Sequence, residues 1–223
     1  MDWKKYWNDN TTLNIDNSIG QVQRKDIEST LLTANYIVRI LDIRKSDDLL
    51  DVCCGNGILT QQIAKKCNQI TGVDDSEKLI NVAEKNYNDI NVKYISCNAL
   101  NIFQSIDNKL FDKIYLQFSF QYFDKKKEGE KVISEMLKSL KPNGKIFIGD
   151  IPNHDNFYKF YGSFMKKIRY LKDKILNKNS MGKFWKVSEL DTICKDLGVK
   201  GTFLKQPKEL PYSHYRFDYL IEN

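Results

Sequence analysis

The 223-residue sequence is poor in the residues that build metal and disulfide sites. It has two histidines, His154 and His214, and five cysteines. Cys53 and Cys54 are adjacent, and no two cysteines have the Cys-x-x-Cys spacing. A zinc site or a disulfide framework needs more histidines or regularly spaced cysteines. We therefore expect no metal site and free thiols.

Long apolar runs and linkers are also missing. No window approaches the roughly 18 apolar residues of a transmembrane helix. The first residues, 1–7, lack the apolar centre of a secretory signal. No repeat, low-complexity tract or Pro/Gly/Ser linker divides the chain. These absences predict a cytoplasmic protein with a single domain over residues 1–223 and no membrane span.

The composition is that of a globular domain, with 41% apolar and 29% charged residues. The net charge is +6, and much of the basic excess lies between residues 159 and 178. A basic balance suits an anionic substrate, RNA or a membrane surface and does not choose between them.

Short apolar segments alternate with segments of helical periodicity from residue 26 onward. The expected strands are 49–52, 69–73, 92–95, 113–118, 145–149, 201–204 and 216–221. The expected helices are 26–41, one opening after Gly57, 76–87, 125–140, and one with a capping signal at Ser188. A turn is expected at 142–144. This alternation predicts an α/β fold, a doubly wound parallel sheet covered by helices on both faces.

Two segments fall outside this rhythm. Residues 1–44 are expected to form an N-terminal helical cap. Residues 155–186 are expected to form a lid-like insertion, which is helical, aromatic and basic over 157–178. Contact with substrate, or with a membrane or RNA, is the alternative for this insertion.

The clearest functional signal is Asp-Val-Cys-Cys-Gly-Asn-Gly at 51–57, between an expected strand and an expected helix. Gly55 and Gly57 allow a sharp turn and a close approach of backbone to ligand. The free N–H groups of the helix that follows suit a carboxylate. Asp51 is placed to hold an ammonium group of the same ligand.

Two further polar residues lie at or just after the ends of the next two strands. Asp74 ends the second strand roughly 20 residues on, where a carboxylate reads a ribose diol. Asn98 follows the third strand and is placed to bind an adenine edge. A dinucleotide is the weaker interpretation, because Thr60 stands where its fingerprint needs a small residue and Asp51 would repel a pyrophosphate.

With these residues the sequence resembles the class I S-adenosylmethionine-dependent methyltransferase family over about residues 30–150. The matching segments are the turn at 51–57, Gly-Val-Asp-x-Ser at 72–76, Asn98-Ala99 and Leu-Lys-Pro-Asn-Gly at 140–144. The resemblance implies a Rossmann-like seven-stranded sheet with the last strand, 216–221, antiparallel. It implies S-adenosylmethionine as cofactor and S-adenosylhomocysteine as product. The cofactor-binding residues it implies are Asp51, Gly55, Asn56, Gly57, Asp74, Asp75, Asn98, Ala99, Gln117 and Phe118.

The acceptor is expected beyond the carboxyl ends of the strands. A neutral hydroxyl needs a general base, whereas a phosphate-like oxygen needs cations. The catalytic candidates are His214, Asp150 and Tyr122, and the substrate-binding candidates are Arg216, Tyr215, His154, Tyr6 and Trp7. Because Arg216 and His214 suit an anion, we expect a small anionic acceptor, a phosphorylated or sugar-type metabolite.

The overall pattern is also similar to small bacterial methyltransferases that modify surface polysaccharides, among them those of capsular O-methyl phosphoramidate assembly. An RNA methyltransferase is the first alternative. Residues 117–122 lack the Asn/Asp-Pro-Pro-Tyr motif of base-modifying enzymes, so no nucleic-acid partner is expected. A non-catalytic nucleotide-binding protein of the same fold is the second alternative. The sequence does not decide the oligomeric state.

Overall fold

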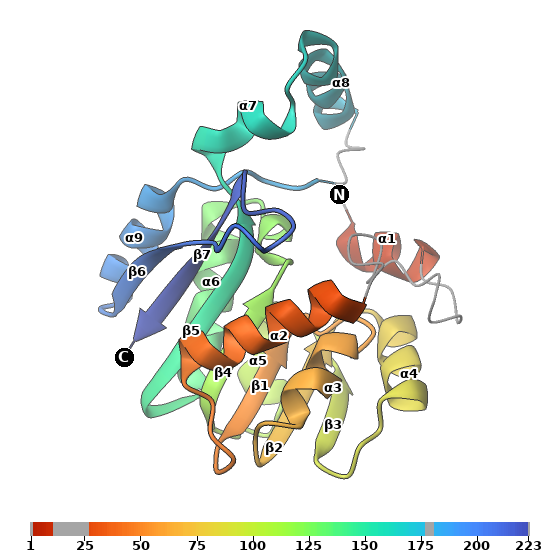
Figure 1. The fold of residues 1–223 in the computed structure, drawn as a ribbon, viewed down its shortest axis with the longest axis vertical. Helices are drawn as coiled ribbons and strands as arrows, with labels where there is room; N and C mark the ends of the chain where they lie inside the picture. The colour runs from red at the N-terminus through yellow and green to blue at the C-terminus, as the bar shows by residue number, and fades with distance from the viewer. Residues whose placement is uncertain (1, 11–26, 177–180, 223) are drawn as a thin grey trace.

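The computed structural model describes residues 2–10, 27–176 and 181–222. Its centre is a seven-stranded sheet in the order β3-β2-β1-β4-β5-β7-β6 (Figure 1). The strands are β1 (Asp48–Val52), β2 (Gln69–Asp74), β3 (Val92–Ser96), β4 (Phe111–Gln117), β5 (Leu140–Pro152), β6 (Lys200–Lys205) and β7 (Arg216–Glu222). The α-helices are α1 (Trp3–Asn10), α2 (Ile27–Leu41), α3 (Ile58–Ala64), α4 (Glu77–Asn86), α5 (Ile102–Ser105), α6 (Lys126–Lys138), α7 (Phe157–Phe160), α8 (Phe164–Ile175) and α9 (Val187–Asp196). Short 3-10 helices are η3 (Ala99–Asn101), η4 (Phe120–Tyr122) and η5 (His154–Asn156).

Strands β1 to β5 pair in parallel, and β7 runs antiparallel between β5 and β6. In the central register, Leu50 of β1 lies between Thr71 of β2 and Ile114 of β4. The strand order reverses at β1, and the crevice at such a reversal is where open α/β sheets bind ligands. The predicted doubly wound sheet with an antiparallel last strand is confirmed.

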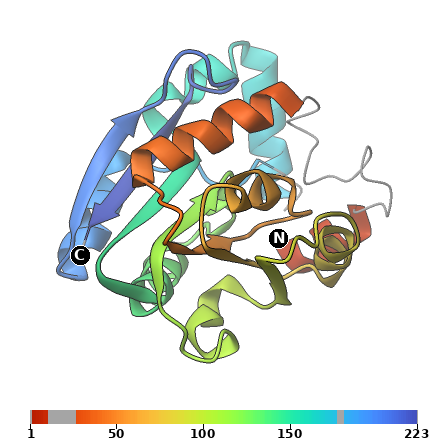
Figure 2. The same ribbon diagram turned by 60° about the horizontal axis from the view of Figure 1, so that its bottom comes forward.

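The two faces of the sheet carry separate apolar layers. Helices α5, α6 and α9 pack on one face, around side chains such as Leu50 and Ile114. Helices α2 and α3 pack on the other, around Leu49 and Tyr115, and α2 crosses this face in Figure 2. Neighbouring residues of one strand enter opposite layers because side chains alternate along a strand.

The expected turn at 142–144 lies within the bounds of β5, and the chain does turn there: Asn143 has φ 61°, and the pairing with β4 passes from Leu140 to Lys145. One local expectation was wrong. The cap of α9 is Lys186, whose N–H donates 2.9 Å to the Glu189 carboxylate, so the helix begins before Ser188. The short helices η3 and α5 were not predicted, because three or four residues are too few to show a helical period.

The insertion at 155–186 is closed at its base. The main-chain N–H of Trp185 donates to the Pro152 carbonyl at 2.8 Å, and the main-chain N–H of His154 donates to the Trp185 carbonyl at 2.9 Å. The Trp185 side chain is fully buried in the core. Helices α7 and α8 therefore extend from a fixed base and project at the top of Figure 1.

Candidate functional site

A cavity of about 640 Å³ lies at the carboxyl ends of the parallel strands, on both sides of the reversal at β1. Asp51 from β1, Asp74 from β2 and Gln117 from β4 line it. The loop after β3 adds Asn98 and Ala99. Residues predicted from four separate segments of the sequence thus meet at one cavity.

Asp51 is the buried carboxylate at the end of β1. Its Oδ2 accepts hydrogen bonds from the Thr60 hydroxyl at 2.6 Å and the Tyr115 hydroxyl at 2.8 Å. Burial raises the Asp51 pKa to about 7 against the opposing effect of those two bonds. A cation that enters the cavity beside Asp51 therefore stabilises its ionised form.

The two glycines of the turn have different tasks. Gly55 has φ +59°, and a Cβ added there would meet no atom within 4 Å. Gly57 has φ +80°, and a Cβ there would lie 2.5 Å from Tyr94 Oη and 2.8 Å from Ala83 Cβ. Gly55 lines the cavity, whereas Gly57 is outside its lining and allows close packing of α3 against β3 and α4. Asn56 lies between them, buried, and also lines the cavity.

Asp74 is held in one orientation by the backbone around it. Its Oδ2 accepts from the Gly55 N–H at 3.0 Å, and its Oδ1 accepts from the Ser76 N–H at 2.9 Å. Burial raises its pKa to about 6, although both bonds favour the charged form. The neighbouring Asp75 pairs with Lys4 at 3.3 Å and accepts a 3.0 Å bond from Asn98.

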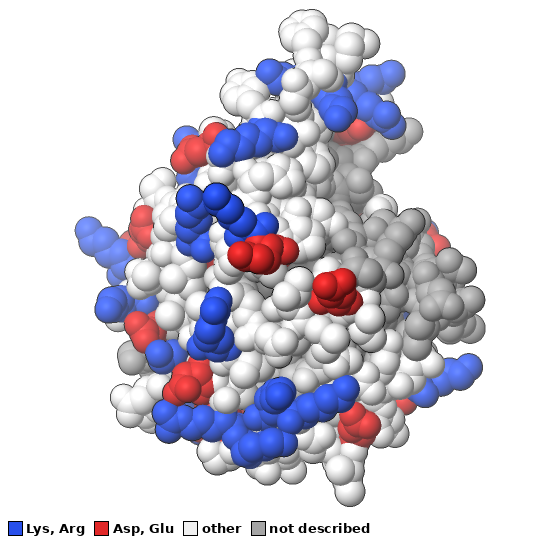
Figure 3. All heavy atoms as spheres, in the orientation of Figure 1, with Lys and Arg blue, Asp and Glu red and all other residues white. Residues whose placement is uncertain are grey.

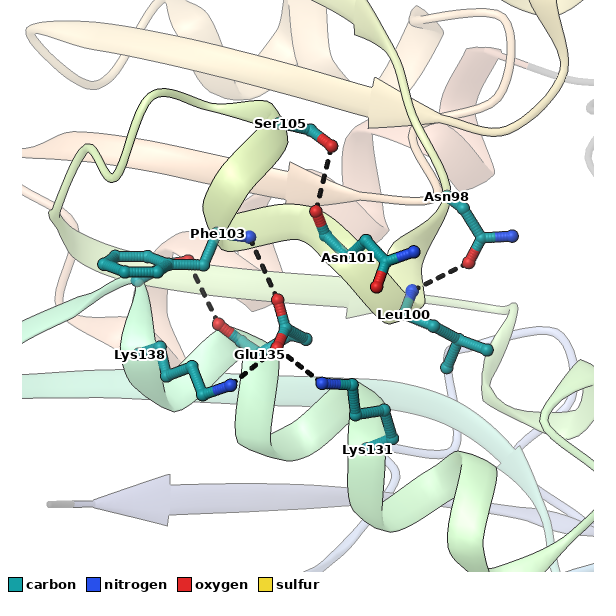
Figure 4. Close-up of polar contacts among 9 residues, drawn as sticks. Asn98, Leu100, Asn101, Phe103, Ser105, Lys131, Glu135 and Lys138 are labelled. Atoms are coloured by element: carbon teal, nitrogen blue, oxygen red, sulfur yellow. Dashed lines mark hydrogen bonds and ion pairs between the residues drawn. The ribbon is translucent and has the colours of Figure 1, made fainter.

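The wall after β3 is built by a helix cap. Asn98 Oδ1 accepts from the Leu100 N–H at 2.8 Å and starts η3 (Figure 4). The next turn is tied to α6, because Glu135 accepts from the Phe103 N–H at 3.1 Å. Lys131 and Lys138 neutralise that carboxylate at 3.0 and 2.8 Å. The cavity wall at Ala99 and Leu100 is therefore supported by an ionic cluster in which the carboxylate is buried and the two lysines are half exposed.

Strand ends next to the cavity carry residues in the left-handed region. Cys53 after β1 has φ 60°, Phe118 after β4 has φ 62°, and Asp150 in β5 has φ 57°. Non-glycine residues seldom take this conformation, and such strain concentrates at functional sites. Cys53 and Phe118 line the cavity. No sequence signal predicts a left-handed phenylalanine.

Helix α1 covers the cavity. Its Trp3, Tyr6 and Trp7 line the opening, and the Trp3 and Trp7 rings lie 4.4 and 5.5 Å from the ring of Tyr122. The Ser76 hydroxyl and Lys78 fix the end of α1 by hydrogen bonds of 2.7 and 2.8 Å to Asn8. Trp3 was missed in the sequence, although its spacing to Tyr6 and Trp7 is that of one helix face.

Asp150 is placed behind the cavity and not in its lining. Its carboxylate accepts from Gln117 at 2.6 Å and from Gln206 at 2.8 Å. Gln206 also bonds the buried Asp218 at 2.7 Å. Burial, and then the nearby charge of Asp150, raise the Asp218 pKa to about 7. Asp150 can orient Gln117, which does reach the cavity.

Arg216 also lies one layer behind the cavity. Its guanidinium stacks 4.1 Å from the Phe118 ring and donates to the Asp150 carbonyl. On its other side Arg216 lines a second pocket of about 360 Å³. The basic residues of that pocket are Lys159, Lys205, Lys208, His214 and Arg216, and no Asp or Glu is among its described lining residues.

Of the remaining candidates, three lie away from the main cavity and one lines it. His214 lies exposed at the second pocket, and His154 is exposed beside Asp155. Tyr215 is buried against Phe160, with ring centroids 4.8 Å apart. Tyr122 does line the cavity, and burial raises its pKa far above the ordinary value, so its hydroxyl keeps its proton at neutral pH.

The insertion at 155–186 contributes no described residue to the cavity lining, so its lid role stays a prediction. In the described ranges no three His, Cys, Asp or Glu residues gather in a metal-binding group. Nor does any helix of those ranges have the length and apolarity needed to span a membrane.

Residues 49–144 match a family described as a methyltransferase domain. The malonyl-[acyl-carrier protein] O-methyltransferase of Halalkalibacterium halodurans is 30% identical over 163 residues, 69% of this chain and 56% of that protein. The ubiquinone biosynthesis O-methyltransferase of Coxiella burnetii is 30% identical over 118 residues, 52% of this chain and 48% of that protein. The chain thus spans about half the length of the curated relatives it matches.

Solved structures extend the likeness over the whole fold. The N-methyltransferase NodS from Bradyrhizobium japonicum, in complex with S-adenosylhomocysteine, aligns with a TM-score of 0.68 at 13% identity, covering 100% of this chain and 99% of that one. The magnesium protoporphyrin IX methyltransferase from Synechocystis aligns with a TM-score of 0.65 at 14% identity, covering 88% and 84%. At such identities the likeness establishes the fold alone.

Proposed function

We propose that this chain, whose residues 49–144 match a methyltransferase domain, is a class I S-adenosylmethionine-dependent methyltransferase that methylates a small-molecule acceptor. The observation that carries the proposal is the meeting of Asp51, Gly55 and Asp74 at one cavity, at the ends of adjacent strands. The relatives named above as O-methyltransferases support an oxygen as the methylated atom.

The residues present fit S-adenosylmethionine. The space beside Gly55, which a Cβ would enter without meeting an atom, admits a ligand against the backbone. Asp51 supplies a carboxylate for the ammonium group, and Asp74 supplies one for the ribose hydroxyls. When bound, the cofactor supplies a methyl group activated by a sulfonium. The chain's own contribution is to orient donor and acceptor and to exclude water under α1.

The acceptor side of the cavity is aromatic. Trp3, Tyr6, Trp7 and Tyr122 line it. Its two lining lysines already have acidic partners, since Lys4 pairs with Asp75 at 3.3 Å and Lys125 with Glu128 at 3.0 Å. Rings with few uncommitted cations favour an acceptor that presents a flat or apolar group. We therefore propose a hydroxyl carried on such a group as the methyl acceptor.

A phosphorylated acceptor is the second candidate. The observation in its favour is Arg216, which stacks on Phe118 of the cavity wall and also lines the basic second pocket. An acceptor with its reactive oxygen in the cavity and an anionic group in the second pocket would use both. The phosphoramidate and capsule role stays a prediction within this candidate, and the relatives described above lend it no support.

An acceptor screen separates these candidates. Purified protein is given methyl-labelled S-adenosylmethionine with phenolic hydroxyl compounds in one set and sugar phosphates in another. Methylated product is followed by mass spectrometry. If the acceptor is flat, we expect turnover with the phenolic compounds. The KM for the acceptor should then rise in Trp7→Ala and stay unchanged in Lys208→Ala. If the acceptor is phosphorylated, we expect turnover with the sugar phosphates. The KM for the acceptor should then rise in Lys208→Ala and stay unchanged in Trp7→Ala. Binding of S-adenosylhomocysteine without turnover in any set would favour a non-catalytic protein.

A further inference from the structure

Helix α8 carries an apolar stripe that faces solvent. The stripe consists of Phe164, Ile168, Leu171 and Ile175, which are 74%, 44%, 57% and 83% exposed. Their spacing places them on one side of an α-helix. A helix of a globular protein normally turns such a stripe toward the core, and large exposed apolar patches mark interaction sites. Met165, next to the stripe, is 72% exposed.

A different side of α8 holds the helix to the body. Tyr170 packs on Phe157 and Tyr161 of the α7 segment, with ring centroids 5.0 and 4.8 Å apart. Helical geometry places Tyr170 more than a quarter turn away from the stripe. Since the insertion is anchored at its base by Trp185, α8 is presented outward on a fixed support (Figure 1).

Cations border the stripe. Lys167 and Lys172 fall on its two sides in helical projection, and Lys166 and Arg169 lie on the remaining surface. The acidic residue of α8, Asp173, pairs with Arg169 at 3.8 Å. Figure 3 shows lysine and arginine side chains on this projecting part, at the top of the view. The surface of α8 therefore combines an apolar stripe with positive borders.

We propose that the α8 surface docks on an anionic lipid membrane. The helix lies in the plane of the headgroups, the stripe enters the boundary with the acyl chains, and the bordering lysines contact lipid phosphates. A second copy of α8 would bring like charges together, and RNA would leave the stripe in water. An anionic bilayer satisfies both the apolar and the cationic residues.

Vesicle co-sedimentation tests the proposal. The full chain is mixed with vesicles of equimolar phosphatidylglycerol and phosphatidylcholine, or of phosphatidylcholine alone, and the partition coefficient is measured. We expect binding to the anionic vesicles and at least tenfold weaker binding to the neutral ones. Leu171→Asp lowers the partition coefficient at least about tenfold. Removing both bordering lysines (Lys167→Ala with Lys172→Ala) lowers it about 25-fold, at roughly fivefold per cation.

Matched variants control for charge and hydropathy. Ile90→Asp changes a fully exposed apolar residue in the loop before β3, and Lys195→Ala removes an exposed cation of α9. Both should bind vesicles as the unchanged chain does. Melting temperatures identify any variant that fails to fold. Three results would overturn the proposal: no binding to anionic vesicles, equal binding to neutral ones, or binding of a folded Leu171→Asp variant at the original strength. Self-association or RNA binding that depends on Leu171, without vesicle binding, would assign the surface to another partner.

Discussion

The Tyr115 hydroxyl donates a 2.8 Å hydrogen bond to Asp51 Oδ2, the same oxygen that accepts from Thr60. Neighbouring strands β1 and β4 thereby fix the Asp51 carboxylate at the reversal of the strand order. The carboxylate is buried and, with a pKa of about 7, is close to half protonated at neutral pH before a ligand arrives. Burying this carboxylate lowers the stability of the fold, but the carboxylate can pair with a cation that binds in the cavity.

The variant Asp51→Asn should therefore separate binding from stability. The amide keeps an acceptor for Tyr115 and Thr60 but cannot attract an ammonium group. We expect affinity for S-adenosylhomocysteine to fall about 30- to 160-fold, the loss of a hydrogen-bonded charge pair worth roughly 2–3 kcal/mol. Stability at pH 8 should stay equal or rise. Calorimetric titration and thermal melting measure the two quantities, and an unchanged affinity would remove Asp51 from the binding site.

The pH dependence of binding follows from the same carboxylate. Because burial raises its pKa to about 7, Asp51 must lose a proton to pair with an ammonium group below that pH. Affinity for S-adenosylhomocysteine should be level above about pH 7.5 and fall as pH drops from 7 to 6. The fall should be smaller in Asp51→Asn, where Asp74 with its pKa of about 6 still titrates, and should be retained in Asp218→Asn. Titrations at half-unit steps of pH test this, and a flat profile in the unchanged chain contradicts it.

Alanine at the two glycines of the turn should have different effects on stability and on cofactor binding. Gly55→Ala places its Cβ in open space, so we expect a cost near 1 kcal/mol for the left-handed backbone and a large loss of cofactor affinity. Gly57→Ala drives a Cβ against Tyr94 and Ala83, so stability should fall by about 2–4 kcal/mol. Urea unfolding and S-adenosylhomocysteine titration of both variants measure this. Equal stability losses would show that the two positions do not have separate tasks.

Asp218 makes a separate prediction about stability. Its folded-state pKa of about 7 lies above the ordinary 3.8, so its contribution is complete below about pH 4 and is lost as pH rises through 7. Asp218→Asn keeps an acceptor for Gln206 and removes the charge near Asp150. The variant should gain about 1–3 kcal/mol relative to the unchanged chain between pH 4 and pH 8. Unfolding at both pH values is the test, and a relative loss at pH 8 would contradict the assignment.

The fold could be predicted because its signals are local. Strand and helix periods alternate along the chain. Asp51, Gly55 and Asp74 could each be predicted as site residues because they lie at or just after the end of an expected strand. Gly57 shows where local reasoning fails. Its task depends on Tyr94, whose hydroxyl bonds the Gly57 carbonyl from 37 residues away. From the turn alone, Gly57 looks the same as Gly55.

The acceptor side could be predicted only in part. The cavity is lined by Tyr6, Trp7 and Tyr122. By contrast, the second pocket is lined by His214, in the loop before β7, and by Arg216, the first residue of β7. A strand end specifies the edge of the sheet but not the direction of a side chain in the loop beyond it. The stacking of Arg216 on Phe118 depends on a left-handed phenylalanine, which the sequence does not signal.

Calorimetric titration with S-adenosylhomocysteine, on the unchanged chain and on Asp74→Ala, tests whether this cavity binds the cofactor. We expect one site of micromolar affinity in the unchanged chain, and no measurable binding in an Asp74→Ala variant that still folds. Absence of binding in the unchanged chain, or undiminished binding in Asp74→Ala, would contradict the assignment of this cavity to the cofactor.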